Sequence, residues 1–150
     1  MSALKNFSLA WLFLFFAILQ APAQDKWQKQ LIKIDDQFAE GDYAKANKGL
    51  AKFKSKLSKK LGSNNEYMAQ YHLRHAKFSI AQGHLLDIDG MIEQALNTSK
   101  SINNEQSQQH ALNQLYVADI LMLYGDYVRA KEFVEKAEKT LKNIDELSDN

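Results

Sequence analysis

The chain has 150 residues, and its 19 basic and 18 acidic side chains nearly cancel, so no overall basic excess indicates nucleic acid as a partner. It contains no cysteine, which excludes disulfides, thiolate metal sites, cysteine nucleophiles and a lipid-modified cysteine. The length suits one domain or a short array of repeats.

The first 23 residues have the layout of a secretory signal peptide. Residues 9–19 form a continuous apolar run, shorter than the ~20 residues that a membrane span usually needs. Ala21 and Ala23 then place small side chains at the two positions that a signal peptidase reads. We expect cleavage after Ala23 and an exported protein, periplasmic or secreted, that meets the membrane only through this segment before cleavage. An uncleaved N-terminal anchor is the alternative.

Residues 24–150 have the composition of one all-helical domain, because they contain no proline and are rich in Ala, Leu, Lys, Gln and Glu. Gly41, Gly83 and Gly125 lie 42 residues apart, and apolar positions recur with the same period on both sides of them. These positions are spaced by three or four, as on one face of a helix. The pattern predicts helices at 26–40, 43–61, 65–82, 85–102, 105–124 and 127–146, in three repeats at about 27–61, 65–102 and 105–146.

Each glycine is predicted to mark a tight turn between the two helices of a repeat. Positive φ at the end of a helix favours glycine, and an aspartate directly after it can cap the next helix. The tyrosine that follows can wedge against the preceding helix, and an alanine one turn later lets the two helices approach closely. The expected structural residues of the turns are Gly41, Asp42, Tyr43, Ala46, Gly83, Gly125, Asp126, Tyr127 and Ala130.

The segments GDYAKANKGLAKF (41–53) and GDYVRAKEFVEKA (125–137) resemble the tetratricopeptide repeat family, in which a Gly-Asp-Tyr turn precedes a small alanine. The middle copy is degenerate, with His84 for the aspartate and Ile88 for the alanine. The resemblance covers essentially all of residues 24–150. It implies an all-α fold of three antiparallel helical hairpins, stacked as a short right-handed α-solenoid. The period of 42 exceeds the usual ~34, which implies longer helices; a HEAT-like repeat of ~40–47 residues is the alternative.

The same resemblance implies a concave groove lined by the first helix of each hairpin, which would bind a peptide or protein. Arg74 and Lys77, one turn apart, would hold a carboxylate of the partner, and Tyr116 would supply a flat anchor. The expected groove residues are Gln28, Ile32, Asp35, Gln70, Arg74, Lys77, Leu112, Tyr116 and Asp119.

The helix predicted at 43–61 is the sharpest electrostatic feature, because no acidic residue occurs between Tyr43 and Asn65. Its apolar positions fall on the opposite side from a lysine stripe, as in a hairpin helix with a solvated outer face. The stripe also suits an anionic lipid, envelope polymer or acidic protein. Its members are Lys45, Lys48, Lys52, Lys56 and Lys59.

The sequence contains no catalytic motif of the Gly-x-Ser-x-Gly, P-loop or His-Glu-x-x-His type, so we expect no enzyme, no catalytic residues and no cofactor. Asp35 and Asp36 are adjacent and point about 100° apart on a helix, so they do not form a facing pair. His72 and His75 share a helix face, but no carboxylate lies four residues from either, and no metal site is expected.

The leading hypothesis is an exported, non-enzymatic helical-repeat scaffold that binds an unidentified protein or peptide. The alternatives are an envelope-surface module that binds anionic material through the helix at 43–61, and the N-terminal input domain of a larger sensor or enzyme. The last hairpin has no further amphipathic helix after it to cover Phe133, Val134, Leu141 and Ile144, which predicts self-association or docking there.

Overall fold

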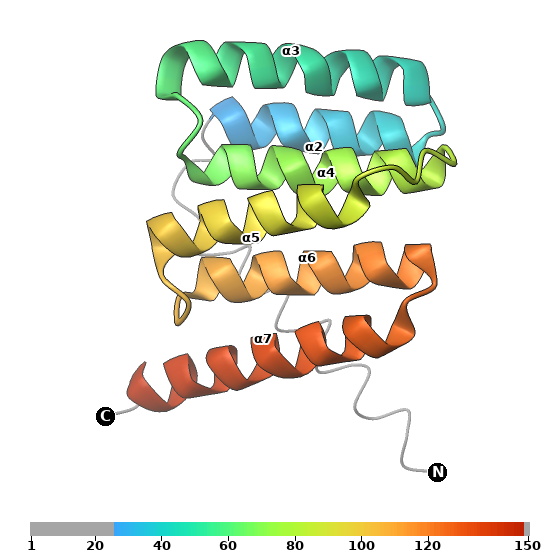
Figure 1. Ribbon diagram of the computed structural model, residues 1–150. Coiled ribbons are helices and arrows are strands. Elements are labelled where there is room, and N and C mark those ends of the chain that lie inside the picture. The colour runs from blue at the N-terminus through green and yellow to red at the C-terminus, as the bar shows by residue number, and fades with distance from the viewer. Residues whose placement is uncertain (1–25, 149–150) are drawn as a thin grey trace.

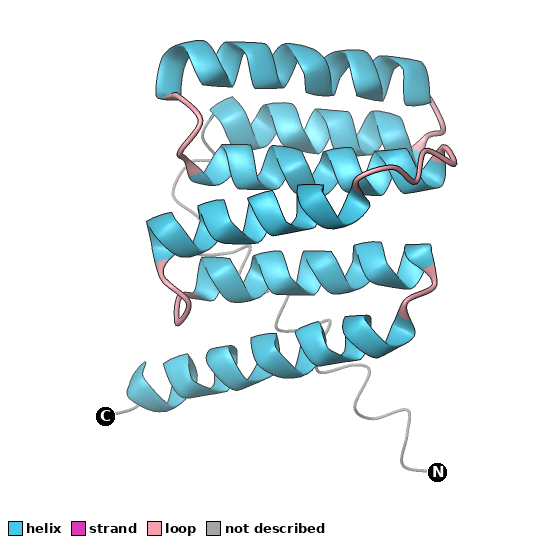
Figure 2. Ribbon diagram, viewed as in Figure 1, coloured by secondary structure: helices cyan, strands magenta, loops and turns pink. Residues whose placement is uncertain are grey.

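The computed structural model describes residues 26–148, which form six α-helices and no strand (Figures 1 and 2). The all-helical prediction is therefore confirmed for this part of the chain. The signal segment predicted at 1–23 lies outside the described residues. The helices are α2 (Lys26–Ala39), α3 (Tyr43–Leu61), α4 (Glu66–Ala81), α5 (Ile88–Asn103), α6 (Gln108–Tyr124) and α7 (Tyr127–Ser148).

Four of the helices start within one residue of their predicted positions, whereas α5 and α6 each start three residues late. Residue 84 is a histidine where the other two turns have a capping aspartate, so no side chain caps a helix at position 85. The chain continues through the exposed Leu85 and Leu86 to Asp87, which has φ +60°, before α5 begins. Helix α6 waits for Ser107, whose side chain accepts a hydrogen bond from the His110 backbone N–H at 3.1 Å.

The glycine turns have the backbone conformation that the sequence predicts. Gly41, Gly83 and Gly125 have φ of +81°, +76° and +89°. Asp42 accepts a hydrogen bond from the Lys45 backbone N–H at 3.2 Å, and Asp126 accepts one from Arg129 at 3.1 Å.

The remaining turn residues follow the prediction with one exception. Ala46 and Ala130 are buried, as a close approach of two helices requires. The Tyr43 ring lies 5.1 Å from the Phe38 ring of the preceding helix, measured between centroids. Tyr127 is 69% exposed instead, which differs from the expected wedge.

Consecutive helices pack against each other, and α4 also packs against α6. In Figure 1 the turns that follow α2, α4 and α6 lie at one end of the molecule, and those that follow α3 and α5 lie at the other. The described core forms two apolar clusters, the first centred on α2 and α3 and the second on α5 and α6. Helix α4 joins them, because its Met68, Tyr71 and Phe78 belong to the first cluster and its Leu73 and Ala76 belong to the second.

Candidate functional site

The residues expected to line a groove lie on α2, α4 and α6, and ion pairs join five of them across these helices. The Arg74 guanidinium donates to both carboxylate oxygens of Asp35, at 2.7 to 3.1 Å. The Lys77 ammonium group lies 2.6 Å from Asp119. We call the nine residues the first-helix face: Gln28, Ile32, Asp35, Gln70, Arg74, Lys77, Leu112, Tyr116 and Asp119.

Tyr116 lies between the two cations of this face. The Arg74 guanidinium carbon is 5.4 Å from the centroid of the Tyr116 ring, and the Lys77 ammonium nitrogen is 5.3 Å from it. Burial raises the pKa of the Tyr116 phenol, so this side chain stays neutral at physiological pH. The ring therefore separates the two ion pairs and contacts both cations through its π face.

Arg74 is only 7% exposed, and its charge is already paired within the molecule. It also donates to the Gln70 backbone carbonyl at 3.3 Å. A carboxylate from a partner would have to displace Asp35 to reach it, so the expected role of Arg74 in holding such a carboxylate is better described as fixing α2 against α4. Lys77 is likewise paired, although more exposed.

Apolar side chains on the first-helix face remain open to solvent. Leu112 is 43% exposed and Ile32 is 36% exposed, while Gln28 and Gln70 are partly buried. The exposed apolar groups and the edge of Tyr116 are the parts of this face that a partner can cover without breaking an ion pair.

A second polar cluster lies between α4, α5 and α6, and the sequence analysis did not predict it. Glu66 accepts hydrogen bonds from the Asn103 and Asn113 side chains, at 2.5 and 2.8 Å. Asn113 also donates to the Ser99 hydroxyl at 2.9 Å, and Ser99 lies 3.2 Å from Nδ1 of His110. Burial raises the pKa of Glu66 and lowers the pKa of His110.

The Ser99 and His110 pair does not form an accessible nucleophile, because Ser99 has no exposed surface and His110 is buried. The cluster satisfies polar groups inside the helix packing. A sequence signal for it exists: Ser99 occupies a column that holds Leu57 and Leu141 in the other repeats. A polar residue at an otherwise apolar repeat position indicates a buried hydrogen bond.

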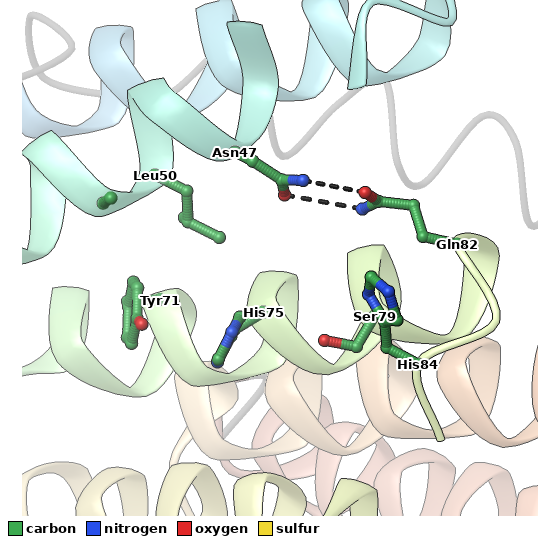
Figure 3. Close-up of a pocket in the computed structure, with 8 residues that line it drawn as sticks. Asn47, Leu50, Tyr71, His75, Ser79, Gln82 and His84 are labelled. Carbon is green, nitrogen blue, oxygen red and sulfur yellow. Dashed lines mark hydrogen bonds between the residues drawn. The ribbon is translucent and has the colours of Figure 1, made fainter. Parts of the chain in front are cut away.

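A crevice of about 180 Å³ lies between α3 and α4 (Figure 3). Figure 3 shows His75 and Ser79 of α4 on one side of it, with Asn47 of α3 facing Gln82 on the other. The two amide side chains bind each other, at 2.8 Å from Asn47 Nδ2 to Gln82 Oε1 and 3.5 Å in the reverse direction. Their polar groups are therefore directed at each other rather than into the crevice.

His72 and His75 both lie next to the Tyr71 ring, at centroid distances of 5.1 and 5.6 Å. Burial lowers the pKa of both imidazoles, and the positive charge of Lys54 lowers them further. Within residues 26–148, no three His, Asp or Glu side chains are grouped in a way that could hold a metal ion.

The lysine stripe of α3 lies on the exposed side of that helix. Lys45, Lys48, Lys52, Lys56 and Lys59 are all exposed, and Ala46, Leu50, Phe53 and Leu57 on the opposite side are all buried. Lys45 pairs with the capping Asp42 at 2.5 Å. The other four have no ion-pair partner among the described residues, so their charges are directed at solvent.

The four apolar residues of the last hairpin that were expected to be incompletely covered are partly buried: Phe133, Val134, Leu141 and Ile144. Phe133 and Val134 pack against the second cluster. Self-association through this hairpin stays a prediction. None of the described helices combines the length and the apolar composition needed to cross a bilayer.

Comparison of the chain with protein-family models, curated proteins and solved structures gives no match.

Proposed function

We propose that this chain is an exported, non-enzymatic scaffold of the tetratricopeptide type, a short right-handed α-solenoid that binds a protein or peptide on its first-helix face. Three features support the proposal: the secretory layout of residues 1–23, the Gly-Asp-Tyr turns repeated 84 residues apart, and six helices that pack in chain order.

The observation that carries the proposal is the set of contacts across the first-helix face. Residues 42 positions apart in the sequence, such as Lys77 and Asp119, touch each other on adjacent first helices. Repeat-equivalent side chains on α4 and α6 therefore form one surface. Exposed Leu112 and the partly buried Tyr116 lie on it within one turn of each other. An apolar and aromatic anchor site framed by paired charges is typical of a protein-binding surface.

Capture from an envelope extract tests this proposal. The immobilised chain retains a partner, and Ile32→Glu and Leu112→Glu each abolish retention, because a charge at the centre of an apolar contact must be desolvated when the partner binds. Leu86→Glu is the matched control, since Leu86 is 88% exposed in the loop before α5 and lies off this face. Equal retention by all three variants would mean that the first-helix face is not the binding surface.

A second candidate function is attachment to anionic envelope material through α3, favoured by the four exposed lysines without ion-pair partners. Charge reversal of Lys48, Lys52 and Lys56 tests it in cosedimentation with vesicles that contain anionic lipid. We expect binding at low salt that the triple variant loses and that about 0.5 M salt suppresses, since the Debye length is then under ~5 Å. Reversal of Lys131, Lys136 and Lys139 on α7 is the control, because that helix carries acidic residues as well.

A further inference from the structure

The two ends of the described helix array differ in polarity, as repeat-equivalent positions show. Met68, Tyr71 and Phe78 of α4 are buried against α2 and α3. The positions 42 residues earlier on α2 are Lys26, Lys29 and Asp36, and all three are exposed. Helix α2 therefore presents a polar surface at the start of the array, as a capping element of a repeat protein does.

The other end of the array lacks such a surface. In the first two repeats Leu31 and Leu73 are 0% and 1% exposed, but their equivalent Leu115 on α6 is only partly buried. Leu50 and Ile92 are likewise buried, and their equivalent Val134 is not. We call the less covered set the open end: Leu115, Met122, Val134 and Leu141.

Met122 is the most exposed member of the open end, at 55%. Its equivalents Phe38 and Ile80 are partly buried, and the Phe38 ring stacks on Phe78 at a centroid distance of 4.0 Å. The helix that follows in sequence supplies this cover in the first two repeats: α4 covers α2 and α3, and α6 covers α4 and α5. Among the described residues no helix occupies the corresponding place on α6 and α7.

An unmatched acidic position accompanies the open end. Asp35 of α2 receives Arg74 from the next first helix, at 2.7 Å. Asp119 is its equivalent on α6, 84 residues later. Although Lys77 binds one of its oxygens, the Asp119 side chain stays 52% exposed. A helix placed on α6 as α4 is placed on α2 would bring a basic residue to this carboxylate.

We propose that the open end binds an amphipathic helix of a partner protein, which completes the array in the way α4 completes the first repeat. The helix carries large apolar residues at positions i, i+3 and i+10 and a basic residue at i+6, as Met68, Tyr71, Phe78 and Arg74 do in α4. This surface lies beyond the first-helix face and shares only Asp119 with it.

A second copy of this chain does not supply such a helix from its polar end. At the corresponding positions α2 has Lys26, Lys29 and Asp36, with Ile32 in place of the arginine. Lysines in place of Met68 and Tyr71 would leave the leucines of the open end uncovered, so head-to-tail stacking of copies does not satisfy it.

The test uses a fluorescein-labelled peptide with the sequence of residues 66–81, which has the required apolar spacing and Arg74. Binding to the exported protein is measured by fluorescence anisotropy. Met122→Lys and Leu141→Lys are expected to weaken binding at least about tenfold, because each places a charge in the apolar contact. Ile32→Lys, at an exposed apolar residue on the opposite end, is the matched control and leaves binding unchanged. Circular dichroism melts confirm that each variant is folded.

A charge exchange tests the predicted register. Arg74→Glu in the peptide weakens binding about tenfold, and Asp119→Lys in the protein restores it toward the original affinity. Restoration requires the two side chains to be in contact, which a general loss of folding would not produce.

Three results would overturn the proposal: no binding of the peptide, binding that is insensitive to Met122→Lys, and binding that Ile32→Lys weakens instead. A dimer that Met122→Lys dissociates in sedimentation equilibrium would show that a second copy covers the open end, and would also overturn it. Capture from the envelope extract relies on Ile32 and Leu112 and not on Met122, so it tests the first-helix face independently.

Discussion

At the scale of single residues, Arg74 makes the most contacts across helices of any charged side chain on the first-helix face. Its guanidinium holds Asp35 with two nitrogens and lies over the Tyr116 ring. Replacing it with methionine keeps the apolar length but removes the charged hydrogen bonds. We expect Arg74→Met to lower the free energy of unfolding by about 2 kcal/mol, which urea denaturation measures.

The neighbouring Lys77 provides the comparison, because it also pairs with an aspartate and contacts Tyr116 but is more exposed. Lys77→Met should cost less than about 1 kcal/mol, since exposed ion pairs contribute little. Arg74→Lys should not restore the full stability, because an ammonium group cannot reproduce the two-nitrogen contact with Asp35. Equal costs for Arg74→Met and Lys77→Met would show that burial does not separate the two pairs.

His72 and His75 predict how stability depends on pH. Their pKa values in the folded protein are lowered from 6.5, mainly by burial and also by Lys54. A lowered pKa means that the unfolded chain takes up protons more readily than the folded one. Their contribution to stability is therefore complete above pH 6.5 and is lost as the pH falls below it. We expect the melting temperature to fall between about pH 7.5 and pH 5.5.

The double variant His72→Gln and His75→Gln isolates this effect, because glutamine does not titrate. Its melting temperature should fall less steeply over the same range. Glu66 and His110 also have shifted pKa values, with Glu66 acting in the opposite direction, but both are present in the wild type and in the variant. Identical slopes for the two proteins would assign the pH dependence to other groups.

At the scale of the elements, side-chain caps decide where helices begin. Ser107 caps α6 through its hydrogen bond with the His110 backbone N–H, and Asn65 caps α4 in the same way through Met68 at 3.1 Å. Ser107→Ala should lower the free energy of unfolding by about 1 kcal/mol, and Ser107→Asp should preserve it, because aspartate also accepts from the helix N-terminus.

Ser63→Ala is the control for the capping prediction, since Ser63 is exposed in the turn between α3 and α4 and caps no helix. Its stability in urea should match the wild type. A loss of the same size for Ser63→Ala and Ser107→Ala would mean that the effect comes from the unfolded chain and not from the cap.

The helix positions that could be predicted from the sequence are those that repeat chemistry fixes. Gly41 and Gly125, each followed by a capping aspartate, indicate where α3 and α7 begin. The start of α5 could not be predicted, because the turn with His84 lacks this cap and the chain instead adopts positive φ at Asp87. Ser107 caps its helix, but Asn104 and Ser107 are both residue types that cap helices, and the sequence alone does not choose between them.

For the candidate site, the period of 42 placed the residues of the first-helix face on α2, α4 and α6 but not their pairings. Arg74 binds Asp35, 39 residues away, whereas Lys77 binds Asp119, 42 residues away. Which of these two offsets applies depends on how each helix is rotated and shifted against the next. Side-chain packing between helices sets that rotation, and a column of equivalent positions does not contain it.

At the scale of the whole molecule, the two apolar clusters share only α4. Cluster residues of α2 and α3 occur only in the first, and those of α5, α6 and α7 occur only in the second. Because each repeat contacts mainly its neighbours, such an array can open from either end without opening the other. Helix α4 can lose its structure only when both clusters open.

This arrangement predicts the order of protection in native-state hydrogen exchange. Backbone amides of Leu73 and Ala76 should exchange most slowly, and those in the last turns of α7 should exchange fastest among the helices, because no later helix covers them. Phe78→Ala should raise exchange rates in α2 and α3 more than in α6 and α7. It removes a fully buried ring from the first cluster, a change that typically costs about 3–5 kcal/mol. If exchange rises equally in all six helices, the array unfolds as one cooperative unit, and the open end cannot behave as an independently fraying edge.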